Sequence, residues 1–185
     1  GIYRPHLPWY VPKKYFDLYP LEDIELPNIL ENDTVDLRNR AKELISRGGN
    51  YHKNIVENGK WKEAVRGYLA SISFADAMVG KLIENLNNSK YADNTIVVIW
   101  SDHGWQLGEK MHWRKFSLWE NVIRTLLMIK VPKKLESLPG GSNNGKNVNS
   151  LTSLLDIYPT LVELSGLPEK QNLDGQSLIS LLKNP

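Results

Sequence analysis

The stretch Thr95-Ile-Val-Val-Ile-Trp-Ser-Asp-His-Gly104 joins a continuous apolar run to a polar turn. The run is rich in β-branched residues, which is typical of a strand buried on both faces of a parallel sheet. Ser101-Asp-His-Gly104 follows it directly, and in open parallel sheets ligands bind beyond the carboxyl ends of the strands. The stretch therefore predicts an α/β fold with a candidate site at the end of this strand.

A long helix is expected just before this strand. From about Lys60 to Asn88, apolar residues recur at the spacing of a helix that buries one face. A helix that leads into a buried strand is an α/β signature. The apolar positions are Ala64, Tyr68, Ile72, Ala75, Val79, Leu82 and Leu86.

Periodicity, capping residues and turn residues predict further elements on either side. These are a helix over 36–47 that ends at Gly48-Gly49, a strand over 126–131, a helix capped by Ser150 or Thr152 that runs to Gly166 and is kinked or broken at Pro159, and a short helix over 176–182.

The composition excludes several classes of protein and several kinds of functional site. With 185 residues, 41% of them hydrophobic, the chain is long enough for one sizeable core and short for two independent domains. The net charge of +2 creates no strong field, so we expect no nucleic-acid partner and only local anion recognition. No run approaches the roughly 20 apolar residues of a membrane span. The absence of cysteine excludes disulfides, zinc-thiolate sites and a cysteine nucleophile in this stretch.

The turn after the strand offers ligands for a cation. Asp102 supplies a hard oxygen, and His103 supplies a nitrogen ligand or a hydrogen bond to an anionic substrate. Gly104 allows a sharp turn or a close approach. Taken alone, these three residues favour a plainer interpretation, in which Asp102 caps a turn and His103 is a satisfied, partly buried side chain.

The residues that follow Gly104 favour a binding site over this plainer interpretation. They place cations among aromatic rings that partly desolvate them, and such cations interact strongly with sulfate or phosphate oxygens. The cationic and aromatic residues are Lys110, His112, Arg114 and Lys115 with Trp105, Trp113 and Phe116.

This region resembles sulfatases of the iduronate-2-sulfatase and choline-sulfatase-like branch of the alkaline-phosphatase superfamily. Those enzymes carry a strand ending in Ser-Asp-His-Gly-Trp, then Leu-Gly-Glu and Trp-x-Lys, which match residues 101–105, 107–109 and 113–115. The resemblance implies an alkaline-phosphatase-like sandwich, with a mainly parallel sheet flanked by helices. It also implies that Asp102 and His103 bind Ca²⁺ or another divalent metal, and that Lys115 contacts the sulfate as a catalytic residue.

A second match lies in Arg4-Pro-His-Leu-Pro-Trp9, which resembles the family's Lys-Pro-His-x-Pro-Phe. Its prolines and aromatic residues predict an extended loop packed by its rings. The resemblance implies that His6 touches the sulfate ester and helps protonate the leaving oxygen, which imidazole does well near neutral pH. Arg4 keeps the family's positive charge in a planar fork and is a candidate substrate contact. Weaker matches over 68–80, 155–168 and 173–178 extend the resemblance along most of the chain.

Three further polar residues have open roles. His112, between the metal turn and Lys115, could face the sugar or alcohol portion of a substrate. Glu109 could bind metal or substrate, or form a salt bridge with a neighbouring lysine or arginine. His52 shows no partner in the sequence and is expected at the surface.

Two features of sulfatases are not found in this sequence. The family's formylglycine nucleophile is made in a Cys/Ser-x-Pro-x-Arg motif, and a preceding pair of aspartates completes the metal site. We therefore interpret residues 1–185 as a partial sulfatase catalytic domain, with the nucleophile-bearing N-terminal portion and the C-terminal end outside this chain. Such a fragment should be inactive alone, since it lacks the covalent step.

The complete enzyme is expected to hydrolyse sulfate esters of a small molecule or a glycan. The nearest alternative is a phosphoesterase or phosphonate hydrolase of the same superfamily, although Lys115 and the Arg4–His6 segment favour the sulfatase branch. A non-catalytic fragment, such as a relic that binds sulfated glycans, is the alternative from a different class. Family members are commonly periplasmic, secreted or lysosomal.

Overall fold

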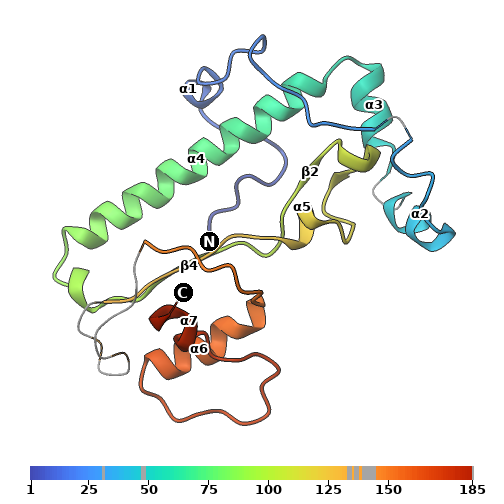
Figure 1. The fold of residues 1–185 in the computed structure, drawn as a ribbon. Helices are drawn as coiled ribbons and strands as arrows, with labels where there is room; N and C mark the ends of the chain where they lie inside the picture. The colour runs from blue at the N-terminus through green and yellow to red at the C-terminus, as the bar shows by residue number, and fades with distance from the viewer. Residues whose placement is uncertain (31, 47–48, 133–134, 136–137, 139–144, 185) are drawn as a thin grey trace. The chain divides into compact units, whose positions relative to one another are not determined.

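The protein was analysed in a computed structural model that describes residues 1–30, 32–46, 49–132, 135, 138 and 145–184. The chain divides into two compact units (Figure 1). The first comprises residues 1–85 and 103–125, and the second comprises residues 86–102 and 126–185. The boundary falls inside the candidate metal turn, since Asp102 belongs to the second unit and His103 to the first.

The first unit is built along α4 (Trp61–Asn87), which confirms the long helix predicted over 60–88. The segment that contains α1 (Lys13–Phe16) runs beside this helix (Figure 1). Arg66 donates two hydrogen bonds, of 3.2 and 3.0 Å, to the carbonyl of Phe16. The buried ring of Tyr15 meets the ring of Phe74 edge-on at 5.5 Å. The segment is therefore attached to α4 by both polar and aromatic contacts.

The N-terminal loop is packed on α4 by its rings, as its composition predicts. A Cβ at Gly67, in the N-terminal third of α4, would lie 2.7 Å from the ring of Trp9. The Trp9 indole donates to the carbonyl of Pro5 (2.9 Å), and its ring meets Tyr68 edge-on at 6.3 Å. Gly67 thus costs some helix propensity but allows the loop to approach the helix closely.

The rest of the first unit consists of short elements. The helix predicted over 36–47 is confirmed as α2 (Asn39–Ser46), and its expected cap residue Gly48 lies outside the described residues. The antiparallel pair β2 and β3 follows the candidate metal turn, with Gln106 opposite Arg114 and Leu107 opposite Trp113. The bounds are α3 Tyr51–Glu57, β2 Gln106–Leu107, η2 Glu109–Met111, β3 Trp113–Arg114 and α5 Glu120–Ile123.

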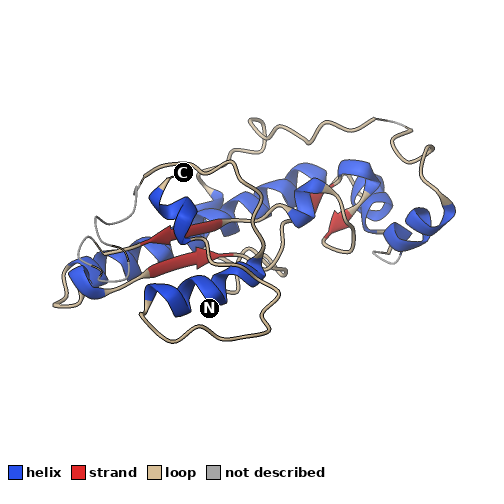
Figure 2. Ribbon diagram, turned by 60° about the horizontal axis from the view of Figure 1, so that its bottom comes forward, coloured by secondary structure: helices blue, strands red, loops and turns tan. Residues whose placement is uncertain are grey.

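The second unit contains β1 (Val97–Trp100) and β4 (Leu127–Lys130), close to the two predicted strands, and they lie side by side (Figure 2). They pair antiparallel, with Val98 opposite Ile129. The predicted parallel sheet is not confirmed, since every strand pairing of the described residues is antiparallel. Trp100 is 53% exposed, so within this chain β1 is not covered on both faces. A β-branched run predicts burial, but it does not specify the direction of the partner strand.

The core of the second unit lies between these strands and the C-terminal helices α6 (Ile157–Leu164) and α7 (Ile179–Lys183), which confirm two predicted helical regions. Thr160 Oγ1 accepts a hydrogen bond of 2.9 Å from the Leu178 backbone N–H, which links the two helices. The buried core residues are Val131, Leu138, Leu164 and Ile179, with Ile96, Ile129, Leu135 and Leu182 packed against them.

The start of the C-terminal helical region differs from the prediction by one residue or more. Ser153, and neither Ser150 nor Thr152, caps η3 (Leu154–Asp156). Its hydroxyl accepts from Leu155 N (3.2 Å), and Asp156 Oδ2 accepts from Ser153 N (2.7 Å), which completes a capping box. Pro159 lies in the first turn of α6, where a proline is tolerated. The helix is not broken at Pro159 as predicted; the helical region changes from η3 to α6 between Asp156 and Ile157.

A short helix η1 (Ala92–Asn94) forms the turn that leads into β1. In the part of the chain that the structure describes, no helix combines the length and apolar character needed to cross a membrane.

Candidate active site

The indole of Trp105, which is 9% exposed, lies between two histidines of the first unit. The ring of His6 meets it edge-on, with ring centres 5.8 Å apart and an angle of 74° between the planes. The ring of His103 lies 6.3 Å away at 28°. Tyr68 of α4 stacks on the same indole at 6.0 Å. The structure thus brings the N-terminal loop, α4 and the turn after β1 together around one side chain.

His6 is held so that its Nε2 is the nitrogen available for proton transfer. Its Nδ1 lies 2.6 Å from the Leu7 carbonyl oxygen and 2.7 Å from the Tyr3 hydroxyl. Because a carbonyl oxygen can only accept, Nδ1 carries a hydrogen. Nε2 then holds the lone pair of the neutral ring, or the transferable proton of the charged ring.

His103 has the same arrangement with the next residue in the chain. Its Nδ1 lies 2.7 Å from the Gly104 carbonyl oxygen, so by the same reasoning Nδ1 carries the hydrogen of the neutral ring. Histidines that bind metals usually donate their other ring N–H to a carbonyl or carboxylate. An exposed Asp102 carboxylate beside such a histidine is a donor pair that fits a divalent cation.

Two ligands alone do not make a closed metal site. Among the described residues, no group of three or more histidine, cysteine, aspartate or glutamate side chains could hold a metal ion. If Asp102 and His103 bind a metal, further ligands must come from elsewhere.

The turn that carries His103 is fastened to α5. Gly104 N donates to Val122 O (2.7 Å), and Trp105 N donates to Asn121 O (2.9 Å). A Cβ on Gly104 would lie 2.0 Å from the Asn121 carbonyl oxygen, so no side chain fits there. The glycine of the Asp-His-Gly motif is therefore explained by its close approach to α5.

Glu109 stabilises the loop that follows His103 through two hydrogen bonds. Its Oε2 accepts from Leu107 N (2.7 Å), and its Oε1 accepts from Asn121 Nδ2 (3.2 Å). These contacts differ from both roles considered from the sequence, a metal or substrate ligand and a salt bridge. Burial, together with the negative charge of Glu109, raises the pKa of Tyr68, so this hydroxyl stays protonated at neutral pH.

The cations before Lys115 do lie over aromatic rings, as their sequence pattern suggests. The Arg114 guanidinium lies 5.3 Å from the ring centre of Tyr51 and 5.6 Å from that of Phe116. Lys110 pairs with Asp33 and lies 5.2 Å from the ring centre of Trp119. These two cations are thus engaged in contacts within the first unit.

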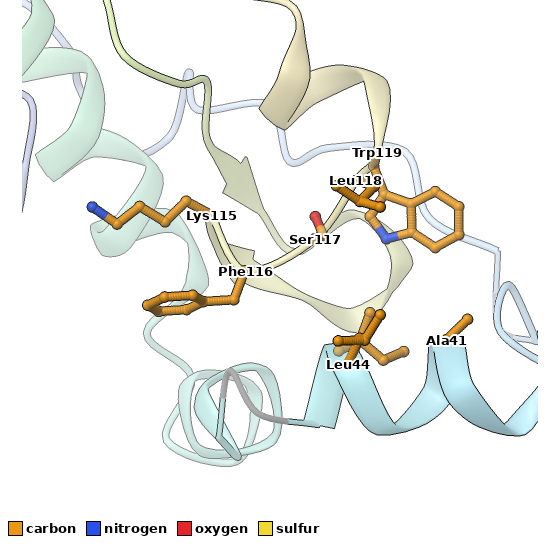
Figure 3. Close-up of a pocket in the computed structure, with 8 residues that line it drawn as sticks. Ala41, Leu44, Lys115, Phe116, Ser117, Leu118 and Trp119 are labelled. Atoms are coloured by element: carbon orange, nitrogen blue, oxygen red, sulfur yellow. The ribbon is translucent and has the colours of Figure 1, made fainter.

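Lys115 is half-exposed and lines a cavity of about 520 Å³ in the first unit (Figure 3). Its side chain extends away from Trp119, which lies at the opposite side of the view (Figure 3). No sequence pattern indicated this cavity, since α2 and the segment after β3 are far apart in the chain. The other lining residues are Ala41, Leu44, Ile45, Phe116, Ser117, Leu118 and Trp119.

Arg4 and His112 make contacts with the protein's own backbone. Arg4 Nε and Nη2 donate to the Tyr10 carbonyl at 3.3 and 3.0 Å, which closes the N-terminal loop. His112 is only 4% exposed and hydrogen-bonds the backbone of Ile45. Its buried Nε2 has no partner among the described residues, and burial lowers its pKa.

His52 was expected at the surface, but the structure shows that it is half-buried. Its Nδ1 accepts a hydrogen bond of 3.1 Å from the Trp113 indole, and its ring meets Trp61 edge-on at 4.9 Å. Both partners come from distant parts of the chain, so the local sequence could not reveal them. Burial lowers the pKa of this histidine as well.

Comparison with known proteins connects this arrangement to one family. Residues 2–167 match the Sulfatase family. The chain is 39% identical over 186 residues to a sulfatase of Formosa agariphila, covering 99% of this chain and 35% of that protein. It is 31% identical over 195 residues to iduronate 2-sulfatase of Mus musculus, covering 91% of this chain and 35% of that protein. The chain thus spans about a third of the length of these curated relatives.

The fold is also shared with a solved structure. The phosphonate monoester hydrolase from Silicibacter pomeroyi matches with a TM-score of 0.82, covering 98% of this chain and 36% of that chain, at 24% identity. At this identity the likeness concerns the fold alone. The match of residues 2–167 and the relatives above 30% identity identify the family: the chain belongs to the sulfatases.

Proposed function

We propose that the full-length protein is a sulfuric ester hydrolase and that this chain supplies one wall of its active site. The observation that carries the proposal is the convergence of His6 and His103 on Trp105, with Nδ1 of each histidine directed to the carbonyl of the next residue. Membership of the sulfatase family supports the reaction type.

In this proposal each residue has a defined task. Nε2 of His6 gives a proton to the alcohol oxygen as the sulfur–oxygen bond breaks. The Lys115 ammonium contacts the sulfate and stabilises its negative charge. Asp102 and His103 hold Ca²⁺ or another divalent metal, which when bound would neutralise charge on the sulfate oxygens. The nucleophile, a formylglycine, is expected outside this chain.

Arg4 and His112 were also predicted to bind substrate, and we propose structural roles for them instead. The Arg4 guanidinium bonds the carbonyl of Tyr10, and the His112 side chain is almost fully buried. A substrate could not reach His112 without displacing the residues that bury it, and two nitrogens of Arg4 already donate to the loop's own backbone.

The proposed substrate is a sulfated small molecule or glycan. The name of the mouse relative, iduronate 2-sulfatase, supports a sulfated sugar. We propose a periplasmic, secreted or lysosomal location, as is common for the family.

Turnover by the full-length protein tests the proposal against its alternative. We expect faster hydrolysis of 4-nitrophenyl sulfate than of a phosphonate monoester or a phosphodiester, with little turnover by residues 1–185 alone. A phosphonate monoester hydrolase shares this fold, so its type of substrate is the alternative included in the assay. Preferential turnover of the phosphonate would replace our assignment with that one.

A further inference from the structure

Trp105 has no chemical task in the proposed mechanism, yet it contacts both histidines of the site. It is 9% exposed, so most of its surface is covered by the first unit. A side chain that contacts both imidazole rings can determine their positions.

The position of this indole is determined on two sides. Its backbone N–H is bonded to Asn121 of α5, and the neighbouring Gly104 abuts the same carbonyl. Tyr68 of α4 stacks on its ring with only 21° between the planes. The indole is therefore fixed to two helices, whereas His6 comes from an irregular loop.

Packing, and not hydrogen bonding, holds the indole in place. Its Nε1 is buried and has no hydrogen-bond partner among the described residues. An aromatic ring without an N–H group should therefore retain most of the arrangement, whereas an aliphatic side chain should not.

The imidazole of His6 is restrained by Trp105 and by its own loop. Tyr3 lies on it with ring centres 4.7 Å apart, and Nδ1 bonds Leu7 O. The Trp105 indole meets the ring edge-on. Among the described contacts of the His6 ring, only the one with Trp105 reaches outside the N-terminal loop. Loss of the indole would therefore leave the ring held by its own loop alone.

We propose that Trp105 is a positioning residue, which holds His6 in the orientation from which Nε2 protonates the leaving oxygen. The inference rests on the proposed function. In this step the N–H bond of Nε2 breaks, an O–H bond forms, and the electron pair of the broken sulfur–oxygen bond remains on the oxygen. A misplaced imidazole slows this step most for esters whose alcohol is a poor leaving group.

The test compares two sulfate esters in the full-length protein. 4-Nitrophenol leaves readily without a proton, whereas a simple alkyl alcohol does not. For Trp105→Leu we expect the kcat for an alkyl sulfate to fall about tenfold more than the kcat for 4-nitrophenyl sulfate, a part of the 10²–10⁴ typical of general acid catalysis. KM should change little for either ester. His6→Ala should show the same selectivity, and Trp105→Phe should recover much of the loss.

Trp61→Leu is a matched control for general destabilisation. Trp61 donates to Leu107 O (2.7 Å) and packs against Gly108 of the same loop. Among the described contacts it touches neither His6 nor His103. We expect this variant to lower Tm while leaving the ratio of the two kcat values unchanged.

A second measurement does not depend on activity. The rate at which diethyl pyrocarbonate modifies His6, followed by mass spectrometry, should rise several-fold in Trp105→Leu and not in Trp61→Leu. If the wild-type protein hydrolyses neither ester, the proposed function fails and this rate alone decides the positioning role. An equal fall in kcat for both esters, or in an inactive protein an unchanged modification rate, would overturn the inference.

Discussion

At the scale of single residues, the site depends on how two histidines are oriented. His6 and His103 each direct Nδ1 to the carbonyl of the next residue, at 2.6 and 2.7 Å. A motif identifies such residues, but only the backbone around them determines which ring nitrogen donates to a carbonyl.

Gly104→Ala should destabilise the first unit. Its Cβ would lie 2.0 Å from Asn121 O, so the turn or α5 must move, at a cost of about 1–3 kcal/mol or more. Thermal unfolding of the full-length protein would show a lower Tm and accompanying loss of activity. Gly80→Ala in α4 is the control, because nothing lies within 4 Å of its added Cβ. Its Tm should stay the same or rise, and an equal drop in both variants would contradict the explanation.

Because His112 is buried, the free energy of unfolding should fall in mild acid. Burial lowers its pKa from 6.5, so as the pH falls below this value the unfolded chain binds a proton that the folded chain does not. The resulting loss grows until the pH reaches the lowered folded pKa. His112→Gln should reduce the difference in Tm between pH 7.5 and pH 5.5.

His52 has a pKa lowered in the same direction, so His52→Gln should also reduce this pH dependence. The double variant should be the least sensitive of the three. A pH dependence unchanged in all of them would show that neither histidine stays neutral in the fold.

At the scale of elements, capping and strand pairing decide what the sequence pattern leaves open. Several hydroxyl residues precede the C-terminal helical region, and each satisfies the local rule for a cap. Ser153 is the one whose hydroxyl reaches a backbone N–H, while Asp156 completes the box. The strand pair shows the same limit, since the apolar runs locate β1 and β4 but not their antiparallel direction.

Ser153→Ala should lower the stability of the second unit by about 1 kcal/mol, which is typical for loss of an N-cap. Ser150→Ala and Thr152→Ala are matched controls at the positions that the sequence favoured, and both should be nearly neutral. Hydrogen exchange of the amides of 153–156 would localise the effect. A larger loss from Ser150 or Thr152 would place the cap there instead.

At the scale of the whole molecule, the chain carries only part of what a sulfatase needs. It spans about a third of its curated relatives, and its described residues form no cluster of three or more potential metal ligands. The proposed metal site must therefore be completed by groups that lie beyond such a cluster of described residues.

Removal and re-addition of the metal should test whether Asp102 and His103 are metal ligands. Ca²⁺ added to the chelator-treated full-length protein should raise its Tm, because an ion that binds only the folded state stabilises it. Asp102→Ala and His103→Ala should each weaken this response and lower activity. His52→Ala is the control histidine, and it should keep the full shift with Ca²⁺. Wild-type response in both ligand variants would remove Asp102 and His103 from the metal site.

The sequence by itself determined the long helix α4, the two strands, the C-terminal helices and membership of a family, because these follow from periodicity and from short motifs of neighbouring residues. Tertiary structure alone decided the strand direction, the partial burial of His52, the burial of His112, and the meeting of His6 with His103 at Trp105. These features depend on which distant segments touch. Local patterns do not encode such contacts, since they arise only when the whole chain packs.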